Sequence, residues 1–216
     1  MYPKDILLGL VLLLSSQSAL SIASRPLGVS IGASNPKLHI EGFLDLVSQD
    51  SLQAYNYLMG EMAAINIETN PDVKFTIYWL PQAAYTFSLA VASGATYILD
   101  NCNNTKDVWQ YIDLIFSRCP AFTNSYTNNQ SLSGMRQHLA SLISQNMTQY
   151  KYNNVLAGLN NETVYRESNY YAGYARSRGI VTAPAFFANG IMIDAAEEFG
   201  SSDWAKFIAN ALKVSR

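Results

Sequence analysis

The segment 180–190 constrains the fold of this 216-residue chain more than any other feature. It follows a basic helix end, turns into Pro184, and continues as a short apolar strand that closes on Asn189-Gly190. Asn-Gly between two apolar runs is the strongest short hairpin signal, because both residues tolerate positive φ. The segment therefore predicts a proline turn followed by an antiparallel hairpin over 185–194.

The apolar pattern elsewhere indicates an alternation of strands and helices. Residues 38–46 and 73–79 are typical of strands, and helical spacing begins between them after Ser48 or Asp50, either of which can cap a helix. Helical spacing dominates roughly 82–178 and returns at the C-terminus. The order strand, helix, strand, helical stretch, hairpin, helix predicts an α/β fold whose first two strands are parallel.

Composition limits the number of domains and the classes of function. Hydrophobic residues make up 49% of the chain, enough for one sizeable core, and the length suits one domain with an insertion. A formal net charge of −2 excludes the basic surface that binds nucleic acid electrostatically. His39 and His138 have no Cys, Asp or Glu at ligand spacing, so we expect no metal site.

The first 24 residues are typical of a secretory signal peptide. Lys4 precedes the apolar run 6–14, and small residues between 19 and 23 offer cleavage sites. The run is too short to span a bilayer comfortably. We therefore expect a mature domain over 25–216 with no stable membrane span, in the endoplasmic reticulum lumen or outside the cell.

Entry into the secretory pathway bears on the cysteines and on the asparagines. The sequence holds two cysteines, Cys102 and Cys119, which predict one structural disulfide. By loop length it would contribute about 3 kcal/mol. A displaced redox dithiol is the alternative for this pair, although it lacks Cys-x-x-Cys spacing. Sequons predict a glycoprotein, with acceptors at Asn103, Asn129, Asn146 and Asn161.

Four pieces of the chain, in this order, resemble the thioredoxin-like fold of DsbA-like oxidoreductases, which are related to kappa-class glutathione transferases. They are Asp45-Leu46 after the first strand, Leu80-Pro81 after the second, the Pro184 segment and Asn189-Gly190. The resemblance covers roughly 36–214. It implies a thioredoxin-like domain with a helical insertion, a cis Ala183–Pro184 bond, and a proline loop lying against the start of the first helix.

The family's redox motif has no cysteine here. In redox members the first cysteine of a Cys-x-x-Cys stands at the helix N-terminus, where free N–H groups and the helix dipole stabilise a thiolate. The matching residues in this chain are Ser48-Gln49-Asp50-Ser51. A serine hydroxyl cannot cycle between thiol and disulfide, so the resemblance implies the scaffold of an oxidoreductase without its usual chemistry.

Three hypotheses for function follow. In the first, the protein is redox-inactive and binds a polypeptide or a small ligand in a groove beside the cis-proline, because extended peptides pair with exposed backbone. In the second, Ser48 activates glutathione, as the kappa-class resemblance implies, rather than only capping the helix. In the third, Cys102 and Cys119 exchange electrons. Glutathione is the one cofactor that these hypotheses involve, and the groove would comprise Ser48, Gln49, Asp50, Ser51, Ala183 and Pro184.

Overall fold

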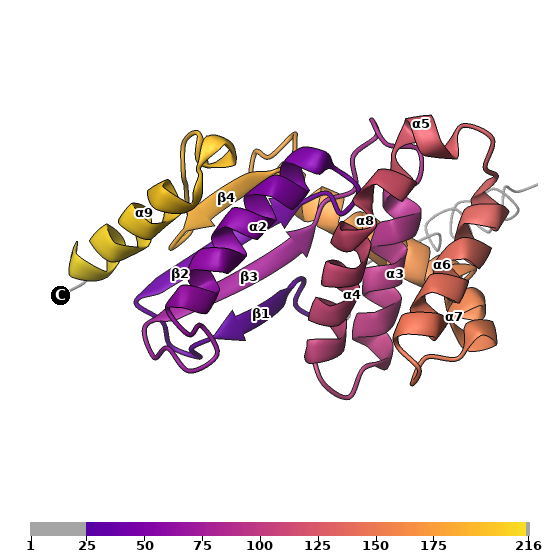
Figure 1. Ribbon diagram of the computed structural model, residues 1–216, viewed down its shortest axis with the longest axis horizontal. Coiled ribbons are helices and arrows are strands. Elements are labelled where there is room, and N and C mark those ends of the chain that lie inside the picture. The colour runs from indigo at the N-terminus through magenta and orange to yellow at the C-terminus, as the bar shows by residue number, and fades with distance from the viewer. Residues whose placement is uncertain (1–24, 215–216) are drawn as a thin grey trace, which may run out of the picture.

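A computed structural model describes residues 25–214 of the chain. The predicted signal peptide, 1–24, lies outside the described residues. The described part has one five-stranded sheet packed between helices, with a helical layer beside it (Figure 1). This is the α/β architecture that the sequence predicts. Within residues 25–214, no helix combines the length and apolar character that a bilayer span requires.

The sheet has the strand order β1-β3-β2-β4-β5. Strands β2 and β3 are parallel, as predicted, and pair from Leu38 opposite Val73 to Leu44 opposite Trp79. The other three pairings, β1 with β3, β2 with β4 and β4 with β5, are antiparallel. The strands span Val29–Gly32 (β1), Leu38–Leu44 (β2), Val73–Trp79 (β3), Ala185–Ala188 (β4) and Ile191–Met192 (β5).

Both faces of the central strands are buried, which explains their nearly continuous apolar sequence. On one face, Gly42 allows close packing, since a Cβ there would lie 3.1 Å from the rings of both Phe75 and Phe186. On the other face, Phe43 stacks on Tyr78 with ring centroids 4.6 Å apart. Alternation along each strand therefore supplies two cores, one on each side of the sheet.

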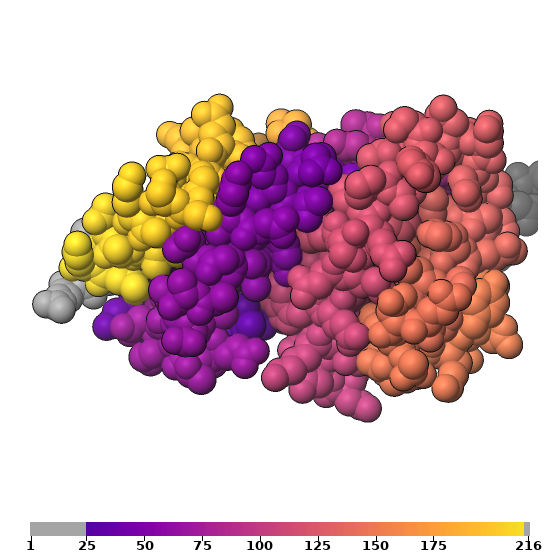
Figure 2. Space-filling view, in the orientation of Figure 1, coloured from indigo at the N-terminus to yellow at the C-terminus, as the bar shows by residue number. Residues whose placement is uncertain are grey.

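Helices α2 (Gln49–Ala64) and α9 (Ser201–Val214) cover the first face. Trp204 of α9 is fully buried and meets Phe186 edge-on, with ring centroids 5.0 Å apart. Figure 2 shows α2, in indigo and purple, fitted between α9 in yellow and the helical layer in magenta to orange. The C-terminal part of α8 covers the second face, where Tyr174 packs against Phe43 and Tyr78.

A helical insertion separates β3 from β4, where the sequence predicts one over roughly 82–178. Helix α3 lies at its centre and packs against α4, α6, α7 and α8. Close approach depends on glycine here, because a Cβ at Gly158 of α7 would lie 2.1 Å from the ring of Tyr97. The helices of the insertion are α3 (Ser88–Asn101), α4 (Lys106–Ser117), α5 (Asn124–Thr127), α6 (Leu132–Asn146), α7 (Tyr152–Leu159) and α8 (Glu162–Ser177), with a short 3-10 turn at Cys119–Phe122. A second 3-10 turn, Ala196–Glu198, lies outside the insertion, between β5 and α9.

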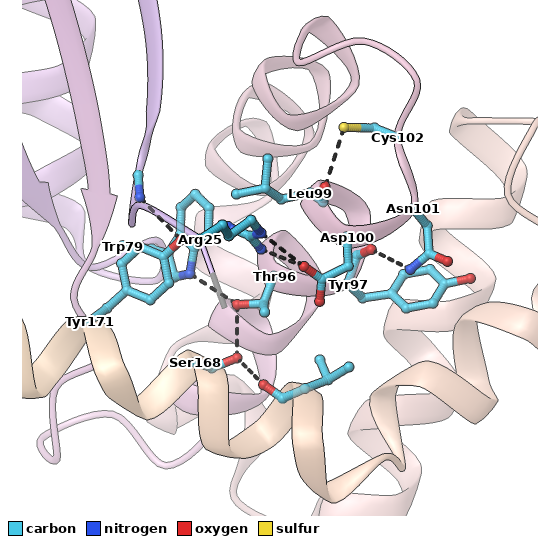
Figure 3. Close-up of polar contacts among 12 residues, drawn as sticks. Arg25, Trp79, Thr96, Tyr97, Leu99, Asp100, Asn101, Cys102, Ser168 and Tyr171 are labelled. Atoms are coloured by element: carbon cyan, nitrogen blue, oxygen red, sulfur yellow. Dashed lines mark hydrogen bonds and ion pairs between the residues drawn. The ribbon is translucent and has the colours of Figure 1, made fainter. Parts of the chain in front are cut away.

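A buried polar network joins the insertion to the sheet (Figure 3). The Trp79 indole N–H donates to Thr96 Oγ1 at 3.2 Å, and the Ser168 hydroxyl donates to the same oxygen at 2.9 Å. The Trp79 ring stacks on Tyr171 of α8, with centroids 4.3 Å apart. Sheet, α3 and α8 are thereby fixed to one another, so that the loops between them hold defined positions.

Candidate functional site

The buried carboxylate of Asp45 lies where β2 ends and α2 begins. Its Oδ1 accepts hydrogen bonds from the Val47 N–H at 3.1 Å and from the Ser88 hydroxyl at 2.8 Å, and its Oδ2 accepts from the Gln82 N–H at 3.0 Å. Burial raises the pKa of Asp45, and the donors from Val47, Ser88 and Gln82 offset only part of that rise. Asp45 thus holds together the start of α2, the loop after β3 and the start of α3.

The sequence resemblance matches Ser48 and Ser51 to the two cysteines of the family's motif. Ser48, one of the two caps that the sequence allows, is the N-cap of α2, and its hydroxyl accepts a hydrogen bond from the Ser51 N–H at 3.3 Å. The Ser51 hydroxyl accepts from the Asp45 N–H at 3.1 Å. Ser48 is 1% exposed and Ser51 is fully buried, so both hydroxyls face the backbone rather than a ligand.

The proline loop lies against this cluster. The Ala183–Pro184 peptide bond is cis, as the sequence resemblance implies. The Gln82 side chain donates from Nε2 to the Ala183 carbonyl at 3.3 Å. Because the Gln82 backbone is bound to Asp45, one chain of hydrogen bonds runs from the end of β2 to the proline loop. The loop is therefore fixed relative to the N-terminus of α2.

A groove of 350 Å³ opens between the first turn of α2 and the proline loop. Apolar side chains beside it face solvent: Val181 is 84% exposed and Met192 is 51% exposed. Among residues 25–214, no hydrogen bond engages the backbone of Val181 or Thr182. The residues that line the groove are Asp50, Gln53, Gly179, Ile180, Val181, Thr182, Ala183, Pro184, Ala185, Met192 and Glu197.

The structure brings only part of the predicted groove together. Asp50, Ala183 and Pro184 line it, whereas Ser48, Gln49 and Ser51 do not. The prediction from the sequence that Ser48 and Ser51 line the groove is wrong. Their hydroxyls accept hydrogen bonds from backbone N–H groups near the start of α2 and therefore point inward. Gln49 is exposed outside the groove. Sequence reasoning missed Gln53, Val181, Met192 and Glu197. Of these, Gln53 alone had a signal, because it lies one helical turn after Gln49.

The predicted disulfide between Cys102 and Cys119 is wrong. Both thiols are free, and they lie at opposite ends of α4, whose 12 residues span about 18 Å. Disulfides need Cα atoms within about 7 Å. Burial, with a smaller contribution from Asp107, raises the pKa of Cys102, and burial together with Asp45 raises the pKa of Cys119 to about 11. Figure 3 shows Cys102 directed toward the Leu99 carbonyl at the end of α3.

The sequon asparagines all lie in the insertion and are exposed. Asn103 and Asn129 are in loops, Asn146 ends α6 and Asn161 is the N-cap of α8. None of them lines the groove. In the part of the chain that the structure describes, no three His, Cys, Asp or Glu side chains are grouped so that they could hold a metal ion.

Comparison with known proteins gives a likeness in structure. No protein-family model matches the chain, and no curated protein matches it. BdbD from Bacillus subtilis is 15% identical at a TM-score of 0.69, over 85% of this chain and 92% of that one. A variant of alpha-DsbA1 from Wolbachia pipientis is 13% identical at a TM-score of 0.65, over 90% of this chain and 94% of that one. MdbA, a thiol-disulfide oxidoreductase from Corynebacterium diphtheriae, is 14% identical at a TM-score of 0.62, over 85% of this chain and 89% of that one. Together with the sheet order and the insertion, these matches show that the chain has a thioredoxin-like fold of the DsbA type.

Proposed function

We propose that this protein binds extended polypeptide segments in the groove beside cis-Pro184 and does not catalyse thiol–disulfide exchange. The observation that carries the proposal is the free backbone of Val181 and Thr182 next to exposed apolar side chains. An extended chain can pair with such backbone groups as an added strand, while pockets take alternate side chains. The hydrogen bonds from Gln82 to Ala183 and Asp45 hold this edge in place before a ligand arrives.

The charge of the groove indicates which segments it would accept. Asp50 and Glu197 are the ionisable side chains among its lining residues, and both are acidic. Val181 and Met192 add apolar surface. A segment that carries both apolar and basic side chains matches this lining, since complementary charge favours encounter and register. Binding should weaken as salt screens the exposed charges.

The absence of thiols at positions 48 and 51 supports the redox-inactive part of the proposal. Thiol–disulfide exchange requires a thiolate that attacks a disulfide sulfur. The thiols that the chain does possess are separated by α4, and the raised pKa values of Cys102 and Cys119 disfavour their thiolates. On this proposal, the protein keeps the peptide-binding groove of the oxidoreductase fold and lacks the cysteines that carry out thiol–disulfide exchange.

The binding test uses fluorescein-labelled, S-carboxamidomethylated α-lactalbumin, which is permanently unfolded, contributes no thiol and gains no charge at its blocked cysteines. Fluorescence anisotropy should show saturable binding to the mature domain. Met192→Lys removes apolar surface and places a positive charge beside the groove, and should weaken binding about tenfold or more, because that charge opposes both the apolar contact and basic side chains. The wild-type domain should also lose affinity for the unfolded protein above about 0.5 M NaCl, where salt screens the exposed charges.

The matched control is Tyr126→Lys. Tyr126 is an exposed apolar side chain on α5, 75% exposed and outside the groove, so the substitution adds the same charge elsewhere. It should leave the affinity unchanged. Absence of saturable binding, or equal weakening by both substitutions, would refute the groove as a polypeptide site.

Thiol–disulfide oxidoreductase activity is the second candidate, because MdbA, which shares the fold, has that activity. It would have to use Cys102 and Cys119. Catalysed reduction of insulin by the wild-type domain that disappears in Cys119→Ala would support it over redox inactivity. A glutathione reaction through Ser48 is less favoured, because the hydroxyl is buried and serves as the helix cap. Titration with glutathione tests this alternative directly.

A further inference from the structure

A second and larger cleft, of 690 Å³, lies between the loop after β3 and helix α8. This volume is in the range of small-molecule sites. Tyr165, Asn169, Ala172 and Arg176 of α8 line it, and their spacing of four, three and four residues places them on one helical face. The adjacent face of α8, which includes Val164, Ser168, Tyr171 and Ala175, is buried in the core.

The facing wall is held in position by hydrogen bonds. Asn124 of α5 accepts from the Thr86 N–H at 2.9 Å and donates to the Ala84 carbonyl at 2.7 Å. Gln82 is fixed by Asp45, as described above. The cleft is thus formed without a ligand, so binding would not have to order the loop first.

The lining combines apolar and polar side chains with a single charge. Leu80, Leu89, Ala172 and Ile180 provide aliphatic surface, and Tyr85 and Tyr165 provide aromatic surface with hydroxyls that bind no described group. Arg176 is the one charged side chain among the described residues that line the cleft. No acidic side chain within 25–214 lies within ion-pair distance of its guanidinium.

An unpaired guanidinium beside the aliphatic and aromatic surface of the cleft selects for an anion with an apolar body. A carboxylate matches the planar guanidinium with two parallel hydrogen bonds and neutralises it with one charge. A phosphate monoester carries a charge of about −1.5 to −2, which one arginine leaves partly unbalanced. We infer that this cleft binds a small amphipathic carboxylate, whose carboxylate pairs with Arg176 and whose apolar body lies against Leu89, Ala172 and the two tyrosines.

The test uses 11-(dansylamino)undecanoate, a fluorescent carboxylate with a long apolar body, and its primary amide as the neutral counterpart. Dansyl fluorescence should rise saturably with the carboxylate, and the amide should bind about tenfold or more weakly. Arg176→Gln should reduce carboxylate affinity to that of the amide. Ala172→Phe, which fills the cleft, should weaken both ligands.

Two controls separate this inference from the proposed function. Arg166→Gln removes an arginine from the same helix but outside the cleft, and should leave carboxylate affinity unchanged. Met192→Lys, which disables the groove, should also leave it unchanged, while Arg176→Gln should still bind unfolded lactalbumin. The inference is overturned if the carboxylate does not saturate, or if Arg176→Gln and Arg166→Gln have the same effect.

Discussion

Replacing Ser88 by alanine tests whether Asp45 is a buried charge held by its donors. Ser88 is 2% exposed and donates to Asp45 Oδ1 at 2.8 Å. A hydrogen bond to a charged group contributes about 1.5–3 kcal/mol, against about 0.5–1.5 kcal/mol for a neutral pair. The Ser88 hydroxyl also accepts from the Gln82 N–H at 3.2 Å, but that N–H keeps its bond to Asp45 Oδ2 and is not left unpaired. We expect Ser88→Ala to lower the free energy of unfolding by about 2 kcal/mol at pH 7.

The effect should depend on pH with a defined sign. Burial already raises the pKa of Asp45 above its unfolded value, so the stability that this group contributes is fully present below about pH 4 and falls as pH rises through the folded pKa. Removing a donor to the charged form raises the pKa of Asp45 further. The loss at pH 3.5, where the carboxyl is mostly protonated in both states, should therefore be only about 1 kcal/mol.

Urea unfolding followed by tryptophan fluorescence at pH 3.5 and pH 7 measures both values. The control is Ser93→Ala, on the same helix and equally buried, whose hydroxyl donates at 2.8 Å to the Leu89 carbonyl within α3. It should change stability by less than about 1 kcal/mol, and equally at both pH values. An equal loss at both pH values for Ser88→Ala would show that Asp45 is not the partner that matters.

Three further predictions follow from the packing and the cap. Gly94→Ala should destabilise the domain by about 1–3 kcal/mol, because a Cβ there would meet the buried Tyr111 hydroxyl at 2.1 Å; Gly173→Ala, with open space around it, should stabilise by up to about 1 kcal/mol in the same thermal-unfolding assay. Ser48→Ala should cost about 1 kcal/mol of stability through loss of the N-cap, read from the urea midpoint. The double substitution Ser48→Cys with Ser51→Cys should create a reducible disulfide with a potential between about −120 and −270 mV, measured by thiol trapping against glutathione; failure to close would contradict the placement of these residues at the redox position.

The sequence predicted the parts of the fold that have a strong local cause. Strand β3 has the predicted bounds, because period-two alternation ends at the Leu80-Pro81 step, and Ser48 caps α2 as expected. Strand β1 was missed: it is four residues long, and glycines with positive φ precede it and end it. Helix α7 was missed as well, because only Val155 and Leu159 of its eight residues are buried.

The candidate site was less predictable, because its residues meet only through tertiary structure. The 17-residue separation of Cys102 and Cys119 is compatible with a disulfide if the segment between them is a flexible loop. In the structure most of that segment is helix α4, which holds the two cysteines apart at its opposite ends. Pro184 and Asp50 can be identified from the sequence by their residue type and position. Met192 and Arg176 do not, since their importance arises from exposure and from the absence of an ionic partner, neither of which has a local sequence signature.

The hydrogen bonds that build the groove also determine when it can form during folding. Gln82 and Ala183 are 101 residues apart, and Asp45 and Ser88 are 43 apart. Contacts of such sequence separation carry a large loop-closure entropy and tend to form late. A nascent or partly folded chain would therefore have neither the proline edge nor its anchors. Binding in the groove would be confined to molecules whose insertion has already docked on the sheet.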